Sequence, residues 1–192
     1  MELVNYFVDY CTDFITSGGP LFGFLLIILE SVIPALPLGV FVALNINSFG
    51  FLFGLILSWI ATCVGCYLSY LLFNYLSNNF IYKFFKENNR KKIEKATIKF
   101  KKIPFSNLVV IIALPFTPAF LINIIAGMSN IPKKKYLIAL LIGKIFMIFF
   151  WAYVGKSLIE SVTDIKTIII VSIMILLAYF ISKLVSKKMN IE

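Results

Sequence analysis

The sequence contains 52 consecutive residues, 31–82, without a charged side chain. A single helix of that length would extend about 78 Å, whereas the hydrocarbon core of a bilayer is only about 30 Å thick. The segment must therefore fold back on itself in an apolar environment. Three further apolar segments follow at 103–132, 136–155 and 167–182, and one of them contains a single charge, Lys144. This pattern predicts an all-α polytopic membrane protein.

The composition agrees with this class and excludes others. Hydrophobic residues make up 60% of the chain and charged residues 14%, against about 25% charged residues in an ordinary soluble domain. A soluble domain, a disordered chain and a secreted disulfide scaffold are therefore excluded, and residues 1–192 are predicted to form one membrane domain. The chain has no histidine, and its carboxylates are not clustered. Because most catalytic and metal sites need such groups, we expect no enzyme activity, no metal and no cofactor.

The basic residues are concentrated in three clusters. The largest comprises Lys83, Lys86, Arg90, Lys91, Lys92, Lys95, Lys99, Lys101 and Lys102, and the others are 133–135 and Lys183, Lys187 and Lys188. By the positive-inside rule we expect the segment 83–102 and the C-terminus to face the cytoplasm. Contact with anionic lipid headgroups explains the clusters, so we expect no nucleic-acid partner. Residues 1–17 combine acidic and aromatic side chains in a pattern typical of an amphipathic helix on the membrane surface.

The two halves of the sequence repeat one order of segments. In each half a short apolar piece precedes a Pro-x-x-Pro motif, and a second short piece, a turn and a long apolar segment follow. The pieces are 21–29 and 38–46 around Pro34 and Pro37, then 105–113 and 119–126 around Pro115 and Pro118. Each piece corresponds to about 12–14 Å of helix, half of a bilayer core. Proline ends a helix because it lacks an amide donor and clashes with the preceding turn.

These lengths predict two re-entrant hairpins, at 20–47 and 103–131, and full spans at 50–80, 135–156 and 165–184. Each hairpin returns to its side of entry and the span between them crosses once, so the second hairpin enters from the opposite face. The result is an inverted repeat, in which paired proline-interrupted segments indicate a transport site near the bilayer midplane. The alternative is four or five ordinary spans with proline kinks.

Two charged side chains lie in or beside the apolar segments. Glu30 precedes the first proline break, and a carboxylate within the membrane is costly enough to indicate a function. It is a candidate for proton binding or for pairing with a cation, and the alternative is an interfacial position at a helix end. Lys144 could attract a phosphate or pair with Glu30. Alternatively, its long side chain could reach the membrane surface, since Lys135 is only about two turns away.

Polar and small residues follow the second break. Thr117 lies between the paired prolines, and Asn123 and Gly127 lie in the apolar piece and turn beyond them. An amide in an apolar hairpin needs hydrogen-bond partners. Thr117 and Asn123 could therefore bind a headgroup or form hydrogen bonds with backbone groups that the helix break leaves unpaired. Asn45 could do the same in the first half.

Cys63 and Cys66 form a C-x-x-C motif, which suggests thiol–disulfide exchange. Cys11 is far away in the sequence, so no second pair exists for a relay. Small residues surround the motif and form one face of the helix, namely Gly54, Ser58, Ala61, Thr62 and Gly65. We therefore interpret the two cysteines as packing residues.

Three stretches of the sequence carry a family pattern. They are ESVIPALP at 30–37, FGFLFGLILSWIATCVGCYLSY at 49–70 and LPFTPAFLINIIAGMSNIPKKKYLIALLIGK at 114–144. Over residues 20–160 the chain resembles the DedA, or SNARE-associated Golgi protein, family, whose core is the VTT domain. The resemblance implies two opposed re-entrant hairpins and lipid transport. Family members translocate undecaprenyl phosphate in bacteria or scramble phospholipids in eukaryotes, and some depend on the proton gradient.

The resemblance places the hairpin Glu of the family at Glu30, its Asn and Gly at Asn123 and Gly127, and its prolines at the four break positions. The chain also departs from the family. A second acidic residue often follows the first prolines, where Leu38 and Gly39 stand here, and an Arg often stands at the position of Ile112.

Together these features predict a transporter or flippase of a lipid in a bacterial cytoplasmic membrane. The expected substrate is a lipid phosphate such as undecaprenyl phosphate, or a phospholipid, and coupling of its movement to protons is a further expectation. Membrane lipids are the expected partners, and the chain could also assemble with copies of itself into a homo-oligomer. The alternatives are a proton-coupled carrier of a small soluble solute, a lipid enzyme and a scaffold. The predicted site comprises Glu30, Pro34, Pro37, Pro115, Thr117, Pro118, Asn123, Gly127 and Lys144.

Overall fold

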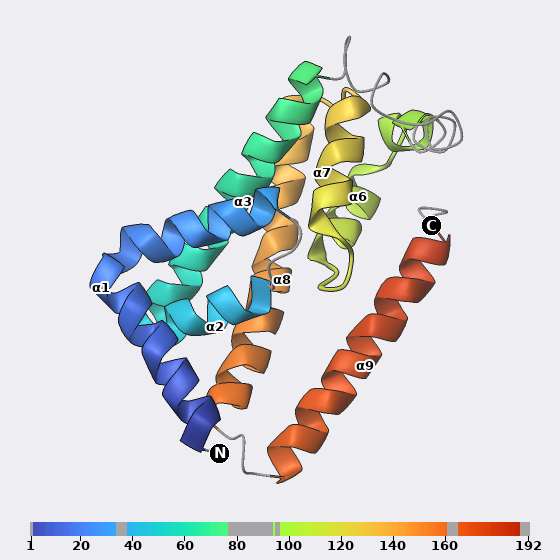
Figure 1. Ribbon diagram of the computed structural model, residues 1–192. Helices are drawn as coiled ribbons and strands as arrows, with labels where there is room; N and C mark the ends of the chain where they lie inside the picture. Colours follow the sequence, from blue (N-terminus) through green and yellow to red (C-terminus); the bar gives the residue numbers. More distant parts are fainter. Residues whose placement is uncertain (1, 34–37, 77–93, 95–96, 161–164, 189–192) are drawn as a thin grey trace.

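The computed structural model describes residues 2–33, 38–76, 94, 97–160 and 165–188, and these residues form helices and short connections without a strand (Figure 1). The helices are α1 (Glu2–Val32), α2 (Leu38–Phe49), α3 (Phe51–Leu76), α6 (Phe105–Ala113), α7 (Ala119–Met128), α8 (Lys133–Glu160) and α9 (Ile165–Lys188). The prediction of an all-α membrane fold is therefore confirmed. Pro34 and Pro37 lie outside the described residues, as do residues 83–93, 95 and 96 of the segment 83–102.

Helix α1 consists of two pieces that meet at Gly19. This glycine has a φ of 70° and a ψ of −179°, and Pro20 follows it. Side chains disfavour a positive φ, and proline is tolerated at the start of a helix, so this pair ends one helical piece and begins the next. The first piece coincides with the predicted amphipathic helix 1–17. The second piece, residues 20–32, is about 20 Å long, which is shorter than a bilayer core.

Helices α3 and α8 are the two long central helices, and they pack against each other. They contain 26 and 28 residues, so each is about 40 Å long and exceeds the thickness of a bilayer core. They run in opposite directions through the molecule (Figure 1). A side-chain hydrogen bond joins them, because the indole N–H of Trp59 donates to the carbonyl oxygen of Leu141 at 3.2 Å.

Three helical segments are long and apolar enough to cross a membrane, Tyr10–Val32, Phe51–Leu76 and Lys133–Gly155. The second and third correspond to the spans predicted at 50–80 and 135–156. The first reaches this length only across the kink at Gly19. The apolar part of α9, Ile169–Val185, is shorter than these segments, and the helices that α9 contacts most are α8 and α6.

The short helices pack around this central pair. The two arms of the first helix pair, α1 and α2, contact each other and α3, and α2 also lies on α8. In the second pair, α6 packs on α8 and α7 packs on α3. Small residues permit these approaches. The small-residue face of α3 is buried, and a Cβ at Gly54 or Gly65 would collide with α2 or α1. Cys63 and Cys66 lie buried in the same helix as free thiols, in keeping with packing roles.

Candidate functional site

The connection between α6 and α7 contains the second Pro-x-x-Pro motif, and it separates two short helices as predicted. Leu114, the last residue before Pro115, is extended, with a φ of −72° and a ψ of 124°. A residue before proline avoids the helical region, so α6 ends there. Pro118 caps the start of α7 with an extended backbone, and the amide of Thr117 donates to the carbonyl oxygen of Leu114 at 3.3 Å. The motif thus forms a tight turn between two helix ends.

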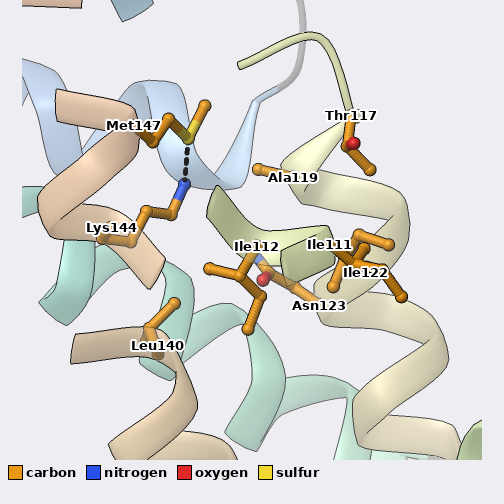
Figure 2. A pocket seen from close by; sticks show the side chains of 9 residues that line it. All are labelled: Ile111, Ile112, Thr117, Ala119, Ile122, Asn123, Leu140, Lys144 and Met147. Carbon is orange, nitrogen blue, oxygen red and sulfur yellow. Dashed lines mark hydrogen bonds between the residues drawn. The ribbon is translucent and has the colours of Figure 1, made fainter. Parts of the chain in front are cut away.

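A small pocket lies beside this turn, between α6, α7 and α8 (Figure 2). Its walls are mostly aliphatic, and it has room for little more than a water molecule in this conformation. Three polar side chains reach it from three parts of the chain, Thr117 from the turn, Asn123 from α7 and Lys144 from α8. The structure thus brings together three of the nine predicted site residues.

Lys144 is a buried cation. Its side chain is 2% exposed, which is incompatible with reaching the membrane surface. The ammonium group donates to the sulfur of Met147 at 3.1 Å, as Figure 2 shows. A thioether is a weak acceptor, so this contact compensates little of the cost of burying a charge. The pocket therefore contains a positive charge without a bound carboxylate.

Thr117 and Asn123 add two hydrogen-bonding groups without partners. Thr117 is 7% exposed and Asn123 is 2% exposed, and neither the hydroxyl of Thr117 nor the amide nitrogen of Asn123 has a partner among the residues that the structure describes. The hydroxyl of Tyr136 donates to the amide oxygen of Asn123 at 2.5 Å. This bond fixes the amide and leaves its nitrogen as the free donor. The pocket thus combines a cation, an amide donor and a hydroxyl, which together suit an anionic or strongly accepting group.

Glu30 belongs to the first helix pair and is not among the residues that line the pocket. It lies near the end of α1 and is partly buried. The next residue, Ser31, donates to the carbonyl oxygen of Ile27 at 3.0 Å and packs against Gly65 of α3. The end of α1 that carries Glu30 is therefore held against the central helix α3.

The comparisons with known proteins agree with this architecture. The VTT domain matches residues 33–157, which include both central helices and the second Pro-x-x-Pro turn. The chain belongs to the VTT domain, or DedA, family. It is 31% identical over 199 residues to the uncharacterized membrane protein YhjE of Bacillus subtilis, covering 99% of this chain and 95% of that one.

A second relative is the uncharacterized protein YqeD of the same organism. The identity is 29% over 136 residues, which cover 69% of this chain and 64% of that protein. No solved structure matches the chain.

Gly127, which the VTT resemblance places in the site, lies away from the pocket. A Cβ on this residue would lie 2.7 Å from the carbonyl oxygen of Tyr70 and 2.9 Å from the amide nitrogen of Asn74, both in α3. The side-chain amide of Asn74 donates to the carbonyl oxygen of Gly127 at 3.0 Å. The glycine therefore allows α7 to approach α3 closely. Its contacts are packing contacts with the backbone of α3.

Trp151 joins the two helix pairs, and the sequence analysis did not identify it. Its ring lies over Gly39 at the start of α2, where a Cβ would collide with the ring. Its ring centroid is also 5.8 Å from that of Phe116 in the second proline turn. Phe116 in turn stacks edge-on against Tyr179 of α9, with a centroid separation of 6.1 Å. The ring of Trp151 thus touches the segments that follow or contain each proline motif.

This contact explains one departure from the family pattern. VTT proteins often carry a second acidic residue after the first prolines, and here Trp151 leaves no room for a side chain at Gly39. The spacing of Lys144, Met147 and Trp151 along α8 places them on one helix face. From the sequence, only this spacing could have pointed to Met147 and Trp151. An apolar span has several helix faces with such a spacing, and only the tertiary contacts show which face lies at the site.

Proposed function

We propose that this VTT-domain protein moves a lipid across the bilayer and that the lipid carries a phosphate. A polyprenyl phosphate such as undecaprenyl phosphate and an anionic phospholipid both have this chemistry. The single observation that carries the proposal is the buried ammonium group of Lys144, which faces a pocket with two further unpartnered polar groups. A phosphate would complete the hydrogen bonds of all three residues.

The lengths of the short helices support a re-entrant arrangement. Helices α6 and α7 contain nine and ten residues, about 15 Å each, so neither crosses a core of about 30 Å. The second piece of α1 and the 12 residues of α2 are also too short. Each pair therefore enters the membrane and returns to the same side. Because α3 crosses between the two pairs, they enter from opposite sides.

The packing pattern supports an inverted repeat. The first arm of the first pair, α1, lies on α3, and the first arm of the second pair, α6, lies on α8. The second arms add the exchanged partners, since α2 lies on α8 as well as on α3, and α7 lies on α3. In these contacts α1 corresponds to α6 and α2 to α7, apart from the additional contact of α2 with α3. In such an arrangement we expect the pocket near the middle of the membrane, where transporters with inverted repeats bind their substrates.

The charges support an orientation in a bacterial cytoplasmic membrane. Lys133 and Lys134 are exposed at the start of α8. Helix α9 runs opposite to α8 (Figure 1), so its basic C-terminal end points toward the side on which α8 begins. The positive-inside rule assigns that side, together with the segment 83–102, to the cytoplasm. In this orientation the second hairpin opens to the cytoplasm and the first to the outside.

The apolar character of the pocket favours a lipid over a soluble solute. A carrier of a soluble solute needs a wet, polar vestibule, whereas here aliphatic side chains surround the three polar groups. The outer surface of α9 is also apolar, with Ile170, Leu177 and Phe180 more than half exposed. A lipid can therefore place its phosphate in the pocket while its acyl or prenyl chain remains in the bilayer.

The test is transport in liposomes. The purified protein is reconstituted with fluorescent phosphatidylglycerol or a fluorescent polyprenyl phosphate, and movement between leaflets is followed by bleaching the outer leaflet. Lys144→Met keeps a long side chain but removes the charge, and we expect the rate to fall by at least about tenfold. Lys134→Met, at an exposed position, is the matched control and should retain the wild-type rate. A wild-type protein no faster than empty liposomes, or a fully active Lys144→Met variant, would contradict the proposal.

A further inference from the structure

Tyr136 is a wholly buried tyrosine in the first turn of α8, and its hydroxyl reaches a residue that lines the pocket. Its ring stacks on that of Tyr70 in α3, with a centroid separation of 4.3 Å and an interplanar angle of 20°. Tyr70 is itself held by its hydroxyl, which donates to the carbonyl oxygen of Ile131 at 2.6 Å. The ring of Tyr136 is therefore fixed, and its hydroxyl donates to the amide oxygen of Asn123.

The proton of the Tyr136 hydroxyl decides which end of the Asn123 amide faces the pocket. A buried phenol needs an acceptor for its proton, and the amide oxygen of Asn123 is the acceptor that it has among the described residues. If the amide turned over, its NH2 group would meet the hydroxyl, and the phenolic proton would lose this acceptor. The amide oxygen is therefore held at Tyr136, and the NH2 group is left for the pocket.

The asparagine of the first helix pair has the opposite orientation. The NH2 group of Asn45 donates to the hydroxyl of Ser58 at 3.2 Å, and its amide oxygen is the end that lacks a partner in the described part of the chain. Each asparagine lies in the second arm of its pair and is bonded to a hydroxyl, but one hydroxyl accepts and the other donates. The partner hydroxyl thus determines whether the free end of the amide is a donor or an acceptor.

The fixed amide makes the polar groups of the pocket mainly donors. The ammonium group of Lys144 and the NH2 group of Asn123 can only donate, whereas the hydroxyl of Thr117 can donate and accept. No carboxylate occurs among the described residues that line the pocket. The oxygens of an ionised phosphate are acceptors and match these donors. In an ethanolamine headgroup a short ethyl link joins the phosphate to an ammonium group, which would meet the like charge of Lys144 and few acceptors.

We propose that Tyr136 is a positioning residue that sets the headgroup selectivity of the site. It holds the NH2 group of Asn123 toward the pocket and thereby favours anionic phosphate headgroups over headgroups that also carry an ammonium group. The inference rests on the proposed function and adds its selectivity. Without the hydroxyl, the amide oxygen can turn to the pocket, where the ammonium group of Lys144 is a donor. An anionic headgroup loses a hydrogen bond by this change, and a headgroup ammonium gains one.

The test compares two short-chain lipids on the detergent-solubilised full chain, anionic phosphatidylglycerol and zwitterionic phosphatidylethanolamine. The dissociation constant of each is measured for the wild type and for Tyr136→Phe, which keeps the ring on Tyr70 and removes the hydroxyl. The wild type should bind phosphatidylglycerol at least about tenfold more tightly than phosphatidylethanolamine. In Tyr136→Phe the affinity for phosphatidylglycerol should fall by about fivefold and the affinity for phosphatidylethanolamine should rise. A purely structural loss would lower both affinities, and that result would contradict the inference.

Tyr70→Phe is the matched control. It removes a hydroxyl from the same ring stack, but this hydroxyl bonds to the backbone of Ile131, which does not line the pocket. Both variants lose one buried hydrogen bond, so their melting temperatures should fall by similar amounts. The ratio of the two dissociation constants should keep its wild-type value in Tyr70→Phe. An equal change of this ratio in both variants would indicate a general loosening of the site and would overturn the inference.

A second substitution shows whether Tyr136 acts through Asn123. Asn123→Leu removes the amide and lowers the affinity for phosphatidylglycerol. Adding Tyr136→Phe to Asn123→Leu should then leave that affinity unchanged, because the hydroxyl has no amide left to orient. A further loss of affinity in the double variant would show that the hydroxyl acts by another route, against the inference.

The outcomes separate this inference from the proposed function. If phosphatidylglycerol binds the wild type and not Lys144→Met, but Tyr136→Phe keeps the wild-type ratio, the selectivity role is wrong and the phosphate site stands. A wild type that binds both lipids equally well would also overturn the selectivity role. If Lys144→Met binds phosphatidylglycerol as well as the wild type does, the proposed site itself is wrong.

Discussion

The two helix pairs repeat one plan, but they treat their asparagines differently. Asn45 of α2 donates its amide to the hydroxyl of Ser58 at 3.2 Å, and Gly23 and Gly54 allow its close packing against α1 and α3. Its amide oxygen has no partner among the described residues, but Asn45 does not line the pocket. Asn123 of α7 accepts a bond from Tyr136, but its amide nitrogen faces the pocket without a partner. The arms of the first pair contact each other, whereas those of the second pack on different helices. The first pair therefore supplies structure and the carboxyl group, and the second supplies the binding pocket.

The largest expected effect is at Glu30, the functional group of the first pair. Glu30→Gln removes the ionised carboxyl group but preserves the size of the side chain. We expect the rate of lipid movement driven by a pH gradient to fall by about a hundredfold, because raising the activation barrier by about 2–3 kcal/mol slows a step by that factor. Transport in liposomes is the measurement, and the yield of monodisperse protein is the control. Full activity in a well-folded variant would remove Glu30 from the mechanism.

The next prediction concerns the free amide of the second pair. Asn123→Asp keeps the acceptor for Tyr136 but places a carboxylate beside Lys144. That carboxylate occupies the cation permanently, so we expect transport to fall by more than about tenfold while the melting temperature is retained or rises. Thermal unfolding in detergent and liposome transport are measured on the same preparation. A variant that transports normally would show that the amide nitrogen does not face the substrate.

The matching substitution in the first pair should lower the stability of the protein rather than its transport activity. Asn45→Ala leaves Ser58 without a partner and opens a void beside Gly23 and Gly54. We expect a loss of about 1–3 kcal/mol in the free energy of unfolding, with little change in transport per folded molecule. The same two assays measure both quantities. If Asn45→Ala reduces transport at unchanged stability, the division of roles between the pairs is wrong.

The contact between the pairs predicts a smaller effect. Trp151→Phe keeps an aromatic ring against Gly39 and Phe116 but removes the indole N–H, which has no partner in the described part of the chain. We expect a severalfold lower rate of transport and a nearly unchanged melting temperature, because ring packing is largely retained. Gly39→Ala pushes the ring aside and should reduce the rate further. Equal, wild-type rates in both variants would show that the two pairs work without this contact.

The smallest effect on transport is expected at Gly127. A methyl group here meets the backbone of α3, so Gly127→Ala should destabilise the fold by about 1–3 kcal/mol through overpacking. The lipid concentration that gives half-maximal transport should not change, because the residue lies outside the pocket. A changed concentration dependence without a change in stability would return Gly127 to the binding site.

The sequence predicts the helix ends well where a local cause acts. The prolines at 115 and 118 end α6 and begin α7 for reasons contained in the neighbouring residues, and the apolar lengths identify α3 and α8. The break in α1 at Gly19 was also encoded locally, as a Gly-Pro pair, although its consequence is one kinked helix. Pro34 and Pro37 lie outside the described residues, so the first proline motif stays a prediction.

The sequence predicts the site less completely, because the decisive facts are tertiary. A lysine two turns from a helix end can reach the membrane surface or be buried, and only the packing of α6 and α7 against α8 decides for Lys144. Gly127 resembles a site residue in the motif, yet its neighbours are backbone atoms of α3. Trp151 shares a helix face with Lys144, but only its contacts with Gly39 and Phe116 distinguish it from the other apolar residues of α8.

The central claim is that Lys144 holds the phosphate of a lipid inside the protein. Native mass spectrometry of gently extracted protein tests it most directly, because a bound lipid adds its own mass. We predict that the wild type retains a phosphate-bearing lipid and that Lys144→Met loses it, whereas Lys134→Met retains it. The same lipid on all three proteins, or no phosphate-bearing lipid on the wild type, would contradict the claim.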